Sequence, residues 1–63
     1  MKKEITEKYE PLTCAEAAQR MRISRDMVYK LIRTKQIPVI KIGATSLIRD
    51  IDVERFLDNH LIM

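Results

Sequence analysis

Hydrophobic and polar positions along the chain predict helices first, then an extended segment, then another helix. In the first helical stretch, four small or apolar residues follow the spacing i, i+3, i+4, i+7: Cys14, Ala17, Ala18 and Met21. Thr13 precedes this stretch and Glu16 follows three residues later, a capping-box pattern in which each side chain accepts a hydrogen bond from a backbone N–H. The pattern predicts a helix that begins after Thr13, with Leu12 packed against Ala17 as a hydrophobic staple.

A second helix is predicted after a short turn at residues 22–23. Ser24 is a favoured N-cap residue, and Asp26 lies in the first turn, where the helix dipole favours a negative charge. The apolar positions of this helix again have helical spacing: Val28, Leu31 and Ile32. Met21 and Met27 are expected to fill the core. Two short helices joined by a tight turn form a helix-turn-helix.

The pattern becomes extended after residue 36. Pro38 prevents continuation of the second helix, and β-branched residues dominate the segment around it, which favours a strand. The predicted elements are a strand, a hairpin loop and a returning strand: residues 37–42, 43–46 and 46–49. Ile40 and Ile42 are expected to face the core, with Lys41 on the other face. Because two strands alone are marginally stable, this hairpin must pack on the helices.

The remaining segments are a third helix and an N-terminal arm. Asp50 is expected to cap the third helix, whose apolar stripe has four members: Val53, Phe56, Leu57 and Leu61. Residues 1–11 lack helical periodicity and are expected to form a flexible arm, which Ile5 and Tyr9 could pin to the core. The predicted fold is therefore α+β, a small winged helix-turn-helix over residues 12–63 in the order α-α-β-β-α.

Composition excludes several classes of protein. The 63-residue chain has little interior and no acidic pair, Cys/His arrangement or Gly-rich phosphate loop in a usable context, so we expect no enzyme activity. Cys14 has no second cysteine to pair with and, with only His60, too few partners for zinc. We expect a buried thiol and no cofactor. The chain has neither an apolar run of roughly 20 residues nor the apolar region of a signal peptide, which predicts a cytoplasmic protein without a membrane span.

The charge is concentrated in the middle of the chain. The net charge is +3 overall, but residues 17–49 hold eight Lys or Arg and a single acidic residue, Asp26, which makes +7. The flanking segments 1–16 and 50–63 carry −1 and −3. A basic block that coincides with the helix-turn-helix and the hairpin is typical of a surface that binds the phosphates of double-stranded DNA.

The exposed face of the second helix carries candidate contacts, because Arg25, Tyr29 and Arg33 follow the spacing i, i+4, i+8. With their neighbours and the hairpin they make up the predicted DNA-binding set: Ser24, Arg25, Asp26, Tyr29, Lys30, Arg33, Lys41, Thr45, Ser46 and Arg49. Arg25 is predicted to contact a base edge, and Tyr29, Lys30 and the hairpin residues to contact phosphates. The alternatives are ordinary solvated charges, and a Tyr29 half-buried against the hairpin.

Four short motifs follow one another along the chain. They are Leu12-Thr13-x-x-Glu16-Ala17-Ala18, Ile23-Ser24-x-x-x-Val28-Tyr29-x-Leu31-Ile32, Ile37-Pro38-x-Ile40-Lys41-Ile42-Gly43 and Ile48-x-x-x-Asp52-Val53-Glu54-x-Phe56-Leu57. The chain resembles the excisionase family of winged-helix DNA-binding proteins, related in fold to MerR-type regulators, and residues 9–23 are similar to excisionases of conjugative transposons. The resemblance implies that the second helix enters the major groove and that the wing contacts an adjacent groove or the backbone. It also implies a protein that assists an integrase in excising a mobile element and catalyses nothing itself.

Two departures from the family pattern bear on these expectations. Arg22 occupies a turn position where many relatives have glycine, and a left-handed conformation there costs a non-glycine residue roughly 1 kcal/mol. The hairpin loop has no arginine, so Thr45 and Ser46 are expected to hydrogen-bond phosphates instead. Two other functions are left open: a phage or plasmid repressor, and a protein-interaction module such as an antirepressor.

Contacts with other proteins are also expected. One small domain buries little surface on DNA, so useful occupancy requires neighbouring copies. The acidic segment Asp50–Asp58 and the basic segment Arg20–Arg22 have opposite charge, which suits head-to-tail self-association on DNA. The apolar residues 60–63 are predicted either to complete the core or to contact a partner.

Overall fold

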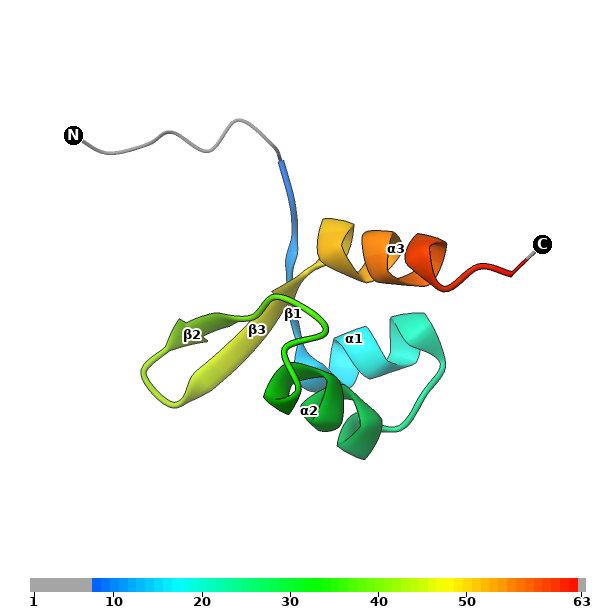
Figure 1. The fold of residues 1–63 in the computed structure, drawn as a ribbon. Coiled ribbons are helices and arrows are strands. Elements are labelled where there is room, and N and C mark those ends of the chain that lie inside the picture. Colours follow the sequence, from blue (N-terminus) through cyan, green and yellow to red (C-terminus); the bar gives the residue numbers. More distant parts are fainter. Residues whose placement is uncertain (1–7, 63) are drawn as a thin grey trace.

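The computed structural model describes residues 8–62 of the chain. The elements in order are β1 (Pro11–Thr13), α1 (Cys14–Met21), α2 (Arg25–Arg33), β2 (Ile40–Ile42), β3 (Thr45–Arg49) and α3 (Asp50–Asn59). The strands form an antiparallel sheet in the order β1-β3-β2. α1 contacts α2, α3 and the sheet, and the β2–β3 hairpin projects beyond the helices as a wing (Figure 1). The predicted small α+β winged helix-turn-helix is confirmed, with β1 as an additional strand.

The start of α1 has the predicted capping box. The backbone N–H of Glu16 donates to Thr13 Oγ1 at 3.1 Å, and the backbone N–H of Thr13 donates to Glu16 Oε1 at 2.9 Å. All four residues predicted for the apolar face are buried, including the thiol of Cys14. Leu12 and Ala17 belong to the same core cluster, as a hydrophobic staple requires. The first helix therefore forms as its local pattern predicts.

Both turns around α2 use non-glycine residues in the left-handed region. Arg22 has φ = 58°, and the N–H of Ile23 donates to the carbonyl of Ala18 at 3.0 Å, which satisfies an orphan carbonyl at the end of α1. Ser24 then caps α2 by accepting a hydrogen bond from the N–H of Met27 at 3.2 Å. A second left-handed residue, Lys35 with φ = 60°, follows α2 and was not predicted.

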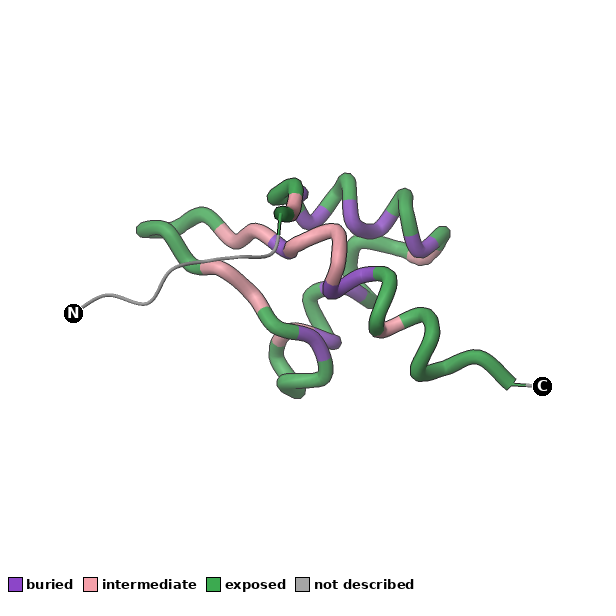
Figure 2. The backbone as a smooth tube through the Cα atoms, turned by 90° about the horizontal axis from the view of Figure 1, so that it is seen from above, coloured by how far each residue is buried: buried purple, intermediate pink, exposed green. Residues whose placement is uncertain are grey.

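The core lies between the three helices and the sheet, with Val53 as the contribution of α3; Figure 2 shows the buried positions along the chain. Met21 is buried as expected, but Met27 is 44% exposed, so the prediction that it fills the core is wrong. α2 turns Val28 and Leu31 inward, and Met27, in its first turn, lies outside that stripe. On α3 the predicted stripe holds only in part: Val53 is buried, Phe56 packs against the core, and Leu57 and Leu61 are exposed.

The inner face of the sheet is the reverse of the one predicted for the hairpin. Leu12 pairs with Ile48, and both are buried, so their side of the sheet faces the helices. Since side chains alternate along β3, Ser46 and its partner Lys41 share this inner side, whereas Ile42 lies on the outer side and is 62% exposed. The expectation that Ile40 and Ile42 face the core is therefore wrong. Their apolar character suggested it, but the strand register set by β1 decides the face.

The residues before β1 attach to the start of α3. The N–H of Glu10 donates to Asp50 Oδ1 at 3.0 Å, and the N–H of Asp50 donates to the carbonyl of Glu10 at 3.0 Å. The prediction that Asp50 caps α3 is wrong, because Arg49 occupies the N-cap position and Asp50 bonds to Glu10 instead. Tyr9 is half-buried, and Ile5 lies outside the described residues. Residues 9–11 are thus held to the domain by the sheet and by Asp50.

Candidate nucleic-acid interface

The outward face of α2 presents the residues predicted to contact DNA. Five of them are exposed there: Arg25, Asp26, Tyr29, Lys30 and Arg33. Their orientation follows from the burial of Val28 and Leu31 on the opposite face, which rotates the cationic stripe toward solvent. Ser24, also in the predicted set, has its hydroxyl engaged as the N-cap of α2. Three positive charges and one negative charge therefore lie on one helix face.

The wing supplies a second group of polar side chains. β2 and β3 are joined by the two residues Gly43 and Ala44, and Gly43 has φ = 59°, which glycine adopts without a steric cost. Lys41 Nζ donates to Ser46 Oγ at 3.3 Å across the hairpin. Thr45 is exposed beside the loop. The wing end of the hairpin is thus short and carries one ammonium group and two hydroxyls.

A hollow between α2 and the wing brings these two groups together. It has a volume of about 260 Å³ and is lined by residues 13–15 at the start of α1, by Arg25 and Tyr29 of α2, and by residues 44–46 of the wing. We call this hollow the trench. Four of the predicted residues meet there: Arg25, Tyr29, Thr45 and Ser46. Thr13 and Ala44 also line it, and sequence reasoning did not place them at the site, because their positions depend on how β1 pairs with β3.

Arg49 differs from the other predicted residues in its contacts within the domain. Its Nε donates to Asp52 Oδ2 at 2.6 Å and its Nη2 to Asp52 Oδ1 at 3.0 Å, and its guanidinium lies 5.4 Å from the ring centroid of Tyr9. Asp52 is buried, so this pair joins β3 to α3 inside the fold. Arg49 also lies on the outer side of β3, opposite Ser46. We therefore assign Arg49 to the stability of the domain and leave it out of the proposed interface.

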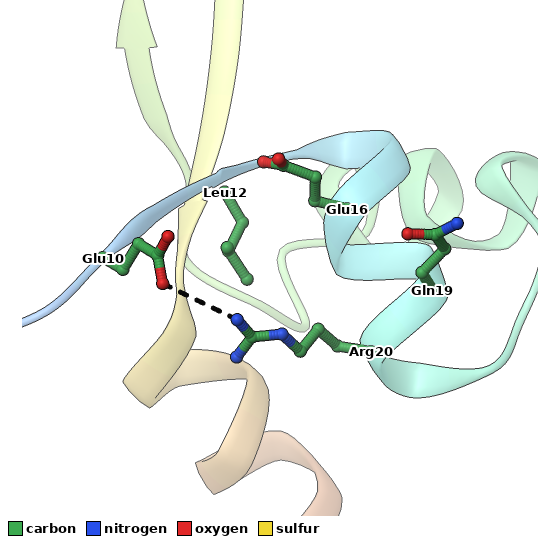
Figure 3. Close-up of a pocket in the computed structure, with 5 residues that line it drawn as sticks. All are labelled: Glu10, Leu12, Glu16, Gln19 and Arg20. Atoms are coloured by element: carbon green, nitrogen blue, oxygen red, sulfur yellow. Dashed lines mark ion pairs between the residues drawn. The ribbon is translucent and has the colours of Figure 1, made fainter.

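A second hollow, on the side of α1 near β1, has mixed charge. Arg20 Nη2 lies 3.6 Å from Glu10 Oε1, and the Glu16 carboxylate lies on the other side of Leu12, next to β1 (Figure 3). The residues that line it are Glu10, Leu12, Glu16, Gln19 and Arg20. The Glu10 carboxylate offsets the charge of Arg20, and Glu16 adds a second negative charge to the lining. Arg20 was counted in the basic block of the sequence, but the fold pairs it with an acidic residue away from the trench.

The described residues form neither a metal site nor a membrane-spanning helix. Within residues 8–62, no group of three or more His, Cys, Asp or Glu side chains is placed to hold a metal ion. In the same part of the chain, no helix is long and apolar enough to cross a membrane. Among the described residues, the surface suited to a binding partner consists of the exposed cationic face of α2, the wing and the trench between them.

A family model for a helix-turn-helix domain matches residues 11–61, which cover α1, α2, the wing and α3. The chain belongs to this helix-turn-helix family. Searches of curated proteins and of solved structures gave no significant match. In helix-turn-helix domains the second helix enters the major groove and contacts base edges, so membership supports DNA as the partner of this domain. In this helix-turn-helix domain the second helix is α2, whose exposed face carries the predicted contacts.

Proposed function

We propose that this helix-turn-helix protein is an excisionase, which binds specific sites on double-stranded DNA and helps an integrase to excise a mobile element. The proposal that the protein binds DNA is supported by the exposed cationic face of α2 beside a polar wing. The excision part rests on the motifs that resemble excisionases. In this proposal the chain catalyses no step, and the partner recombinase breaks and rejoins the DNA.

In the proposed complex, α2 lies in the major groove and the wing contacts the adjacent groove or backbone. Arg25, in the first turn of α2, reads a base edge, because the N-terminal residues of a recognition helix approach the bases most closely. Arg pairs bidentately with the O6 and N7 atoms of guanine. Lys30 and Arg33, further along α2, neutralise phosphates and hold the helix in register.

Neighbouring copies are proposed to bind side by side and to bend the DNA. A single module of this size buries about 600–1,000 Å² on DNA, so one copy binds weakly. Glu54 and Asp58 are exposed on α3, and Arg22 is exposed at the turn between α1 and α2. Contact between these groups on successive copies gives a head-to-tail array, which can offset a bending cost of order 1–6 kcal/mol.

Gel shifts on DNA carrying one, two or three copies of a site selected by the protein test this proposal, with circular permutation of the site to measure bending. An excisionase is expected to bind several adjacent sites cooperatively and to bend the fragment. Asp58→Asn and Arg22→Gln should each lower cooperativity while leaving the affinity for a single site nearly unchanged. A repressor would be favoured if the DNA stays straight, if the protein binds a palindrome as a two-fold symmetric dimer, and if neighbouring sites are occupied independently of one another.

A further inference from the structure

The trench has the shape and chemistry to hold one strand of the DNA backbone. We propose that a single phosphate group of duplex DNA lies in it, bound on one side by the hydroxyl of Tyr29 and on the other by Ser46 and Lys41 of the wing. This inference rests on the proposed binding of DNA and adds to it the path of one strand across the protein. In this placement, the recognition helix and the wing contact the same DNA strand from opposite sides.

The geometry of the duplex gives the first argument. The major and minor grooves of B-DNA are separated by one sugar-phosphate strand on each side, and the grooves are about 12 Å and 6 Å wide. A helix in the major groove and a hairpin beside it therefore straddle the intervening strand. In this domain the space between α2 and the wing is a hollow of about 260 Å³, open between Tyr29 and residues 44–46. The strand that separates the grooves passes through that space.

The side chains that line the trench suit a phosphate. Tyr29 is 46% exposed, and its phenol can donate a hydrogen bond to a phosphate oxygen. Arg25 lines the same hollow from the first turn of α2. Among residues 8–62, no carboxylate lines the trench, whereas Glu10 and Glu16 line the hollow beside α1 and would repel a phosphate there. Another hollow, at the end of α2, is lined by Lys35 and Gln36 but otherwise by the apolar residues Ile32 and 37–39, and no residue of the wing lines it.

The strand register adds a cation to the wing side of the trench. Lys41 pairs with Ser46, and both lie on the side of the sheet that faces the helices. Lys41 Nζ donates to Ser46 Oγ at 3.3 Å, which holds the ammonium group next to a residue that lines the trench. The Ser46 hydroxyl accepts from Lys41 and keeps its own hydrogen to donate. A phosphate at this position meets one ammonium and two hydroxyl donors from opposite walls.

A scan with neutral phosphates tests the placement. The probe is a duplex selected from a randomised pool by the wild-type protein, in which one phosphate at a time is replaced by an uncharged methylphosphonate. At one position, or two consecutive positions, replacement should weaken wild-type binding about tenfold, the effect of losing hydrogen bonds to a charged group. The variants Tyr29→Phe and Ser46→Ala should bind the unmodified duplex more weakly and lose most of their sensitivity at that same position.

Two matched controls separate this contact from general effects. Tyr9→Phe removes the same hydroxyl from a tyrosine that lies beside Arg49 and does not line the trench. It should keep the wild-type scan, and Lys35→Gln should keep it too, whereas Lys41→Gln should lose sensitivity at the shared position. If Tyr29→Phe shows the same sensitive phosphates as Tyr9→Phe and wild type, the placement is wrong while the proposed DNA binding stands. If the wild-type protein selects no duplex at all, the proposed function fails and this placement fails with it.

Discussion

Replacing Asp52 by alanine should destabilise the domain more than any change on its surface. The Asp52 side chain is 5% exposed and accepts two hydrogen bonds from Arg49, at 2.6 Å and 3.0 Å. Asp52→Ala removes the buried carboxylate that binds Arg49 at the junction of β3 and α3 and that also lies 3.9 Å from Arg55 Nη1. Breaking a buried ion pair by removing one partner costs about 3–5 kcal/mol, because the remaining charge loses its compensation.

The exposure of Arg49 sets where in this range the loss should fall. Its side chain is 27% exposed, so water compensates part of the charge and we expect a loss near the lower limit, about 3 kcal/mol. A chain of 63 residues has a free energy of unfolding of roughly 3–9 kcal/mol. The substitution therefore removes a third or more of the stability and lowers the melting temperature by roughly 12 °C or more.

Urea denaturation followed by far-UV circular dichroism measures this loss. Asp58→Ala, at an exposed position of the same helix, is the matched control and should change the free energy of unfolding by less than about 0.5 kcal/mol. The double variant Arg49→Met with Asp52→Leu should recover most of the loss, since it removes both charged groups. Equal losses for Asp52→Ala and Asp58→Ala would refute the reasoning, and so would a double variant as unstable as Asp52→Ala.

Three further predictions concern binding and the turn between α1 and α2. If the protein makes roughly four to six phosphate contacts, a plot of log K for DNA binding against log salt concentration should have a slope near −4 to −5. Fluorescence anisotropy measures this slope, and binding that does not depend on salt would contradict the prediction. Arg25→Ala should weaken the binding free energy by about 1–3 kcal/mol on the selected site and by little on random DNA, whereas Lys41→Ala should weaken binding to both DNAs about equally. If the two variants behave alike in these titrations, Arg25 does not contact a base. Arg22→Gly should raise the free energy of unfolding by about 0.5–1 kcal/mol, because glycine adopts φ = 58° without strain; a lower melting temperature would count against it.

The first two helices and their N-caps could be predicted because the interactions that form them are local, whereas the predicted Asp50 cap of α3 was wrong because Asp50 bonds to the distant Glu10. Thr13 and Glu16 are three residues apart, and so are Ser24 and the backbone N–H of Met27, so both caps are visible in the sequence. The apolar face of α1 and the left-handed turn at Arg22 follow from the same short-range rules. Most of the exposed residues on α2 were therefore identified correctly as a single surface, although their contacts with DNA stay predictions.

The sequence by itself determined the order of the three helices and the hairpin, the position of the helix-turn-helix and the concentration of charge around it, but not the strand β1. Tertiary structure decided which side of the wing faces the helices, because that choice depends on the pairing of Leu12 with Ile48, two residues far apart in the chain. It also decided that Arg49 binds Asp52 inside the fold. The trench arises in the same way, since Tyr29 and Ser46 meet only when the hairpin packs beside α2. Local patterns specify helices and caps, whereas pairing between distant segments places the side chains that make a site.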